Sequence, residues 1–426
     1  MRKIFQSAFL ILIIIGSVVL MSATPVSKAE NSTNVKGIID SDTTWTKEES
    51  PYSLTGLVAI VSGVTLTIEP GVTVNIGDYS LQVGGTLDAR GRGADNITFV
   101  SNTAGYGNIA FVNGSSSWDE KNGSGCIIEN AILVSTSISV NNASPKIYNS
   151  TISGNINVDN EGALPLISRN IIAGDVGVHS ASPTIDHNSI IGGINIGGNS
   201  PIISNNIIEG GGVSGIGIKF SGQYTVNVSW NTIYGCSTGI SAEASSIIAG
   251  NLVIDNDDGI ELYSAQFQIQ NNTIADNSIG IKMVRLGSYQ GLMINSNNIQ
   301  NNSQNSIYLE DTRSNIDATL NWWGTIEGQI ISLTIHDRND EPKLGSVSFS
   351  PTLSGPVPEA PATKYTPIEM PSLPSQEPST TTQSQTNNQP SNQNGIYTLA
   401  IAAIILSVII NISLVIVVAV LLKKRH

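Results

Sequence analysis

The sequence predicts an all-β protein built as a parallel β-solenoid, in which short strands pair from one coil of the chain to the next. Three observations support this prediction. An Asn-x-Ile element recurs through the middle of the chain at steps of 18 to 25 residues, and an apolar residue stands three positions before each of its members. The intervening runs are short, rich in Ile and Val, and punctuated by Asn and by many of the 41 glycines. Runs of this kind are typical of strands separated by tight turns.

The repeated asparagine predicts a ladder of side chains stacked along the solenoid axis. Asparagine tolerates tight-turn conformations, and stacked amides can hydrogen-bond to one another. Ser150 fills one place in the series, which closes with Asn321-x-Trp323. The expected ladder residues are Asn130, Asn170, Asn188, Asn206, Asn231, Asn251, Asn272, Asn297 and Asn321.

Two further columns keep register with the asparagines. The apolar column is expected to fill the interior, and it consists of Ile127, Ile147, Ile167, Ile185, Ile203, Val228, Ile248, Ile269 and Ile294. A second ladder is expected five residues after the first, at Asn155, Asp175, Cys236, Asn256, Asn277 and Asn302. Cys126 would lie roughly 24 Å from Cys236, too far for a disulfide, so both are expected to be free thiols.

Other repeat architectures fit less well. Helical periodicity over ten or so residues is nearly absent, which excludes a repeat of paired helices. A propeller blade needs four strands in roughly 40 residues, about twice the length of the unit seen here.

These columns, and two flanking segments, carry a resemblance to a known family. The segment GVTLTIEPGVTVNIGDYSLQVGGTLDARG from Gly63 and the segment beginning NWWGT at Asn321 look like the opening and closing coils of surface β-helix proteins. Together, the columns and the two segments resemble the right-handed parallel β-helix repeat of the pectin-lyase-like superfamily. They also resemble the NosD-like surface proteins built from this repeat. The resemblance covers roughly residues 35–351 and implies roughly 13 coils. Trp322 and Trp323 would close one end and the stretch around Trp45 the other.

The two ends of the chain predict export and membrane anchoring. Residues 1–29 have the basic start, apolar run and small-x-small site of a cleaved signal peptide, with an uncleaved signal anchor as the alternative. Residues 396–422 carry no charge and are long enough for a transmembrane helix. The basic residues of the tail, 423–426, then place the C-terminus in the cytoplasm and the rest outside the cell.

Between these ends the chain divides into two parts. Residues 30–351 are expected to form the β-helix ectodomain, with a cap at each end. Residues 352–395 are rich in Pro, Ser, Thr and Gln and predict a disordered stalk. Asn-x-Ser/Thr sequons before the stalk predict a glycoprotein.

Composition excludes some functions. The formal charge is −13, and clustered Lys and Arg are lacking, so a nucleic-acid partner is not expected. Four His and two Cys are scattered along the chain, so no transition-metal cluster is visible.

The candidate catalytic pair is Arg169 and His187. Each directly precedes a ladder asparagine, which would put them about 5 Å apart on successive coils. A polysaccharide lyase needs a base near the sugar and a cation on its carboxylate. The resemblance also implies motifs that are missing: of those typical of the superfamily's hydrolases, only Asp257-Asp258 is present. A structural role for His187 is the alternative.

Two binding sites are also candidates. Asp255, Asp257 and Asp258 form the densest acidic stretch and could hold Ca²⁺, with a solvated turn as the alternative. Trp230 and Tyr234 could stack against sugar rings on the flank of the solenoid.

The sequence therefore predicts a membrane-anchored cell-surface protein that binds extracellular glycans or envelope components, by carbohydrate binding, adhesion or a structural role. No cofactor is expected beyond the candidate Ca²⁺. A surface polysaccharide lyase or epimerase is the alternative function. The resemblance to NosD-like proteins implies a third, accessory work in metalloenzyme maturation, although no copper ligands are visible.

Overall fold

The computed structural model describes residues 32–102, 107–210, 215–263, 266–287 and 292–363. The predicted signal peptide, transmembrane helix and tail, and the stalk from residue 364 onward, lie outside the described residues. No helix within the described ranges is long and apolar enough to span a membrane.

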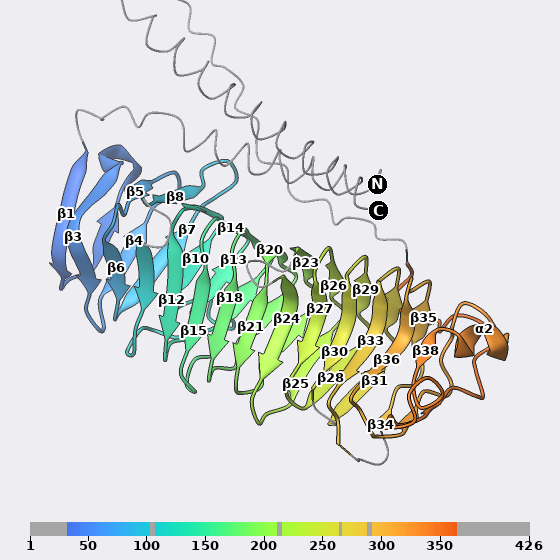
Figure 1. Ribbon diagram of the computed structural model, residues 1–426. Helices are drawn as coiled ribbons and strands as arrows, with labels where there is room; N and C mark the ends of the chain where they lie inside the picture. Colours follow the sequence, from blue (N-terminus) through green and yellow to red (C-terminus); the bar gives the residue numbers. More distant parts are fainter. Residues whose placement is uncertain (1–31, 103–106, 211–214, 264–265, 288–291, 364–426) are drawn as a thin grey trace, which may run out of the picture. The chain divides into compact units, whose positions relative to one another are not determined.

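The described chain is a parallel β-solenoid of about 13 coils, which confirms the predicted fold class. Each full coil contributes one strand to each of three sheets, and each strand pairs in parallel with the strand three places further on, as β10 does with β13 (Figure 1).

Sheet 1 comprises β2 (Thr43–Trp45), β4 (Thr65–Ile68), β7 (Thr86–Arg90), β10 (Ile127–Glu129), β13 (Lys146–Tyr148), β16 (Leu166–Ser168), β19 (Thr184–Asp186), β22 (Ile202–Ser204), β25 (Val226–Ser229), β28 (Ser246–Ala249) and β31 (Phe267–Gln270). A bridge between Ile269 and Ile294 continues it into β34 (Leu292–Met293), β37 (Ile316–Asp317) and β39 (Val347–Ser348).

Sheet 2 comprises β5 (Thr73–Asn75), β8 (Ile97–Val100), β11 (Ala131–Val134), β14 (Thr151–Ile152), β17 (Ile171–Ile172), β20 (Ser189–Gly192), β23 (Ile207–Gly210), β26 (Thr232–Tyr234), β29 (Leu252–Ile254), β32 (Thr273–Ala275) and β35 (Asn298–Gln300).

Sheet 3 comprises β6 (Ser80–Val83), β9 (Asn108–Phe111), β12 (Ser137–Asn141), β15 (Ile156–Asp159), β18 (Val176–His179), β21 (Ile194–Gly197), β24 (Ile216–Ser221), β27 (Thr238–Ala242), β30 (Asp258–Leu262), β33 (Ile279–Val284), β36 (Asn305–Glu310) and β38 (Ile335–His336). The long strand β3 (Tyr52–Ile60) belongs to both sheet 2 and sheet 3, and β1 (Thr33–Ile39) pairs with it.

The interior is a stack of branched aliphatic side chains. Strand residues alternate between the interior and the outside, so one residue in two is buried. The column members from Ile147 to Ile294 are each at most 2 % exposed. Both cysteines are buried and free, and burial raises the pKa of Cys126 to about 11 and that of Cys236 to about 12.

The two ends are closed by aromatic side chains. Trp45 stacks on Tyr52 at the first coil, with ring centroids 4.8 Å apart, next to a short 3₁₀ turn η1 (Lys47–Glu49). Trp323 is buried against the edge of Phe349 at the last coils, close to the short helix α2 (Gly328–Ser332). Trp322 instead lies half-buried and donates from Nε1 to Gln300.

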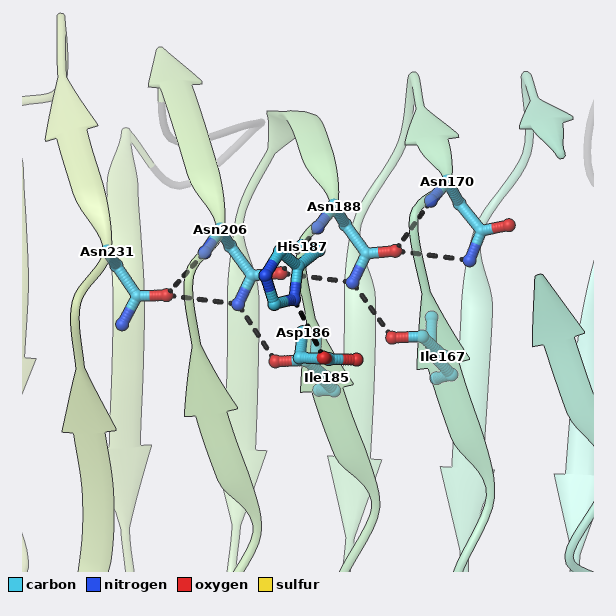
Figure 2. Close-up of polar contacts among 8 residues, drawn as sticks. All are labelled: Ile167, Asn170, Ile185, Asp186, His187, Asn188, Asn206 and Asn231. Carbon is cyan, nitrogen blue, oxygen red and sulfur yellow. Dashed lines mark hydrogen bonds and ion pairs between the residues drawn. The ribbon is translucent and has the colours of Figure 1, made fainter. Parts of the chain in front are cut away.

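A hydrogen-bonded asparagine ladder follows the turn between sheets 1 and 2 (Figure 2). The backbone N–H and the side-chain Nδ2 of Asn188 both donate to Oδ1 of Asn206, at 3.0 Å each. Nδ2 of Asn188 also donates to the backbone carbonyl of Ile167, at 2.9 Å. The same backbone bond links every neighbouring pair from Asn170 to Asn321, at 2.8 to 3.0 Å. Eight of the nine expected ladder residues therefore lie in this column.

Asn130 does not belong to the ladder, and its expected position is corrected by one residue. Strand β11 pairs with β14 so that Ile132 lies opposite Thr151, which places Ala131 rather than Asn130 opposite Ser150. The backbone N–H of Ala131 accordingly donates to the Ser150 hydroxyl. The same shift moves the interior position of this coil from Ile127 to Ile128. Asn130 occupies the turn position just before the ladder, where it is half-buried and has a left-handed backbone.

Candidate functional site

The turn between sheets 1 and 2 recurs on successive coils as a continuous edge, here called the turn ridge. One residue in each turn, directly before the ladder position, has a left-handed backbone with φ between 46° and 70°. The ridge residues are Asn130, Asn149, Arg169, His187, Asn205, Trp230, Gly250, Asn271, Ser296 and Leu320. Ladder residues point inward and are hydrogen-bonded. On the ridge, Gly250 is buried and Asn130, Asn205, Asn271 and Ser296 are half-buried; the exposed members are Asn149, Arg169, His187, Trp230 and Leu320.

The left-handed backbone explains why Asn and Gly recur on the ridge, and why other residues there are notable. Asn and Gly adopt this conformation readily, whereas a bulky residue loses roughly 1–2 kcal/mol in it. Leu320 accepts that cost at φ 56°. So do Arg169 and Trp230, at φ values of 57° and 58°, while His187, at 54°, is of a residue type that adopts this conformation more readily. Arg169, His187, Asn205 and Trp230 occupy four successive coils, or about 15 Å of ridge. Strained residues gathered in this way point to function.

Arg169 and His187 are neighbours on the ridge, as the sequence predicted. The backbone N–H of Arg169 donates to the carbonyl of Asp186, at 3.2 Å, and both ridge side chains are exposed. The Nδ1 atom of His187 lies 2.8 Å from Oδ2 of Asp186, which fixes an imidazole whose side chain is 45 % exposed (Figure 2). The other carboxylate oxygen of Asp186, Oδ1, is buried and has no hydrogen-bond partner within the described residues.

Trp230 forms a flat platform on the ridge. Its side chain is 55 % exposed, and its ring lies over the backbone of Gly250 on the next coil. A Cβ atom at Gly250 would stand only 2.8 Å from a ring atom, so glycine makes room for the indole.

Tyr234 lies on a different surface, the outer side of sheet 2. Its hydroxyl donates to Oε2 of Glu209 at 3.0 Å, and its ring packs against Leu252 and Ile254. Burial raises the pKa of Glu209, and the hydrogen bond from Tyr234 partly offsets that rise. Trp230 and Tyr234 therefore do not form one aromatic surface, and only Trp230 presents a broad exposed ring.

An open cleft of about 370 Å³ lies further along the same ridge. Asn271 and Ser296, two ridge residues, form one wall, and residues 353–359 form the other. Asn271 is two coils from Trp230, or roughly 10 Å.

Asp255, Asp257 and Asp258, the candidate Ca²⁺ residues, do not gather around a common point in the described residues. No three Asp, Glu, His or Cys side chains in the part of the chain that the structure describes converge on a point where an ion could sit. Asp255 and Asp257 are exposed, and Asp258 turns toward Lys282, with 3.4 Å between Oδ2 and Nζ.

Lys282 is the centre of an ion network on sheet 3 that the sequence did not reveal. Its Nζ also lies 3.3 Å from Glu261 and 3.2 Å from Glu310. Burial alone would lower the pKa of Lys282, but its hydrogen bonds and the three carboxylates outweigh burial and raise it. The network keeps Lys282 charged and occupied. The signal in the sequence is that Glu261 and Lys282 each directly follow a Gly-Ile pair, and the strand register indeed places them side by side.

Comparison with known proteins agrees with the architecture. Residues 176–322 match the family model described as the right handed beta helix region. The match spans fewer than half of the 426 residues, and the structure continues the same coils on both sides of it. Neither a curated protein nor a solved structure matches the chain.

Proposed function

We propose that this right-handed parallel β-helix is a membrane-anchored cell-surface protein that binds extracellular glycans along the turn ridge. The observation that carries the proposal is the run of Arg169, His187, Asn205 and Trp230 on four successive coils. All four hold a left-handed backbone, which the side chains of Arg169 and Trp230 disfavour.

The chemistry of these side chains suits a sugar chain. An exposed indole face stacks on the apolar face of a pyranose ring, and amide, imidazole and guanidinium groups bond hydroxyls. Arg169 supplies a local positive charge that can pair with a carboxylate where the glycan carries one. Regular spacing along the ridge matches an extended repeating ligand better than a compact one.

Binding is favoured over turnover because the larger cluster of charged groups lies away from the ridge. The carboxylates around Lys282 lie on sheet 3. The carboxylate that contacts the ridge residue His187 is that of Asp186. A lyase or epimerase is the second candidate, favoured by the adjacent Arg169 and His187. A catalyst needs its acid, base and charge-neutralising groups converging on the reacting atoms.

The substitution Trp230→Asn tests the proposal without disturbing the fold. Asparagine is the residue that the ridge turn prefers, so the variant should be at least as stable as the parent. We expect its retention on a glycan array to fall by about tenfold, equivalent to ~1.4 kcal/mol. The matched control is Tyr79→Asn, which removes another exposed aromatic ring, outside the turn ridge. Unchanged retention in Trp230→Asn would rule out the ridge as the binding surface.

A further inference from the structure

The chain does not leave the solenoid at its last coil but turns back along the outside of sheet 2. Residues 352–363, here called the C-terminal strap, were expected to begin the disordered stalk. The backbone N–H of Leu353 donates to the carbonyl of Asn321, at 3.0 Å. Val357 is buried, and its N–H donates to Oδ1 of Asn298, at 2.7 Å.

Specific side chains hold the strap. Asn298 and Thr273 point outward from β35 and β32, yet both are at most 5 % exposed. Nδ2 of Asn298 donates to the hydroxyl of Thr273 at 3.2 Å, and that hydroxyl donates to the carbonyl of Pro361. The relay runs from one strap residue, through two solenoid side chains, to another strap residue.

The contacts between the C-terminal strap and the coils are evenly spaced along the strap. Leu353, Val357 and Pro361 are bonded to three successive coils, at Asn321, Asn298 and Thr273. Each coil is therefore crossed in four residues. Continued at this rate, residue 365 would reach the next coil, whose strand is β29.

That next coil carries an apolar patch on its outer side. Val253 of β29 points into the interior, so Leu252 and Ile254 point outward. They are nevertheless only 4 % and 7 % exposed, and with Ala275 they form a buried cluster separate from the main core. The described strap ends at Thr363, about one coil before this patch.

We propose that residues 364–368, Lys-Tyr-Thr-Pro-Ile, continue the strap and dock on Leu252 and Ile254. Five residues reach up to ~16 Å, enough to cross this coil and the next. The segment carries Tyr365 and Ile368, whose apolar surfaces fit the patch, and it begins where the described strap ends. The C-terminal strap is thus a clasp over at least four coils rather than the start of a free stalk.

Engineered cysteine pairs in the full-length chain test this docking. The natural cysteines are buried and do not compete. Under mild oxidation, Leu252→Cys combined with Tyr365→Cys or with Ile368→Cys should form an intramolecular disulfide in at least one of the two combinations. Thr273→Cys with Pro361→Cys serves as the positive control, since the two residues are in contact.

The matched negative control pairs each strap cysteine with Ile171→Cys. Ile171 is the outward residue at the equivalent place four coils earlier, roughly 19 Å from Leu252. We expect cross-linking at Leu252 to be at least about tenfold faster than at Ile171. Equal rates at the two sites would overturn the proposal. A disulfide between two Leu252→Cys chains would overturn it as well, because a second copy would then cover the patch.

A labelling measurement gives an independent test. A thiol-reactive maleimide should modify the single variant Leu252→Cys slowly in the native chain. The added substitutions Tyr365→Ser and Ile368→Ser should speed that reaction by about tenfold, since they weaken the cover. Equally slow labelling in both chains would show that something other than residues 364–368 shields Leu252.

Discussion

The indole ring of Trp230 lies over Gly250 so closely that a Cβ atom at Gly250 would come within 2.8 Å of it. Two neighbouring coils thus cooperate: one supplies the aromatic platform and the next supplies the space beneath it. Both residues have left-handed backbones, at φ values of 58° and 70°. The position of the Trp230 ring therefore depends on the glycine beneath it.

The variant Gly250→Ala should therefore displace the Trp230 ring and weaken glycan binding. It also places Ala at a positive φ, which costs roughly 1 kcal/mol of stability. The control Gly63→Ala carries the same backbone penalty at φ 83° but meets no atom within 4 Å. Glycan retention should fall only in Gly250→Ala. An equal fall in both variants would mean that lost stability, and not the ring position, lowers binding.

The asparagine ladder makes a second prediction, about stability. Replacing Asn188 by Ala leaves the backbone N–H of Asn170 and the carbonyl of Ile167 buried without these partners. Buried polar groups without partners cost about 1–3 kcal/mol each, so we expect a loss of roughly 3 kcal/mol in the free energy of unfolding. Asn195→Ala, on the half-buried outer side of β21, should change it by less than ~0.5 kcal/mol. Denaturant unfolding measures the free energy of unfolding of both variants. Similar losses in Asn188→Ala and Asn195→Ala would contradict a stabilising role for the ladder.

The ladder also shows how far the sequence could be read. A column of Asn at coil spacing is informative because a buried amide needs its partners in register, and this requirement fixed eight positions correctly. Asn130 was misplaced because asparagine suits two adjacent sites, the ladder and the left-handed turn before it. Only the pairing of β11 with β14 separates them.

Other features could not be predicted because they depend on contacts between distant coils. The Trp230 ring lies over Gly250, and Lys282 lies among three carboxylates. Both arrangements depend on strand register and side-chain direction rather than on a local sequence pattern. The C-terminal strap was hidden by its composition, since its prolines and small residues resemble a linker. Its attachment comes from Asn298 and Thr273, residues that look unremarkable in sequence.

Glu209 predicts a pH dependence of stability. Burial raises the pKa of its carboxyl in the folded state, so ionisation is harder there than in the unfolded chain. The protonated carboxyl contributes its full stabilisation at pH values below its ordinary pKa. This stabilisation is lost as the pH rises through the raised pKa of the folded state. Glu209→Gln lacks this loss, so its stability relative to the parent should increase across that window. Tyr234→Phe removes a hydrogen bond that lowers the pKa and should move the window upward. Denaturant unfolding at a series of pH values checks this, and a difference that stays constant with pH would contradict it.

The proposed topology predicts a cleavage pattern on intact cells. Protease added outside should release the β-helix by cutting after the C-terminal strap and before residue 396, where the sequence predicts a solvated stalk. Mass spectrometry of the released fragment would locate its C-terminus. Protection of the whole segment against protease, with the protein intact in the membrane, would contradict an external β-helix.

Binding without turnover is the central claim, and a single assay addresses it. Incubate the purified protein with acidic polysaccharides, with and without added Ca²⁺, and measure in the same samples both retained glycan and newly formed unsaturated or reducing ends. We predict glycan retention that depends on Trp230, with no new ends formed. Turnover that is lost in Arg169→Ala or His187→Ala would contradict the account and establish the turn ridge as the active site of a lyase.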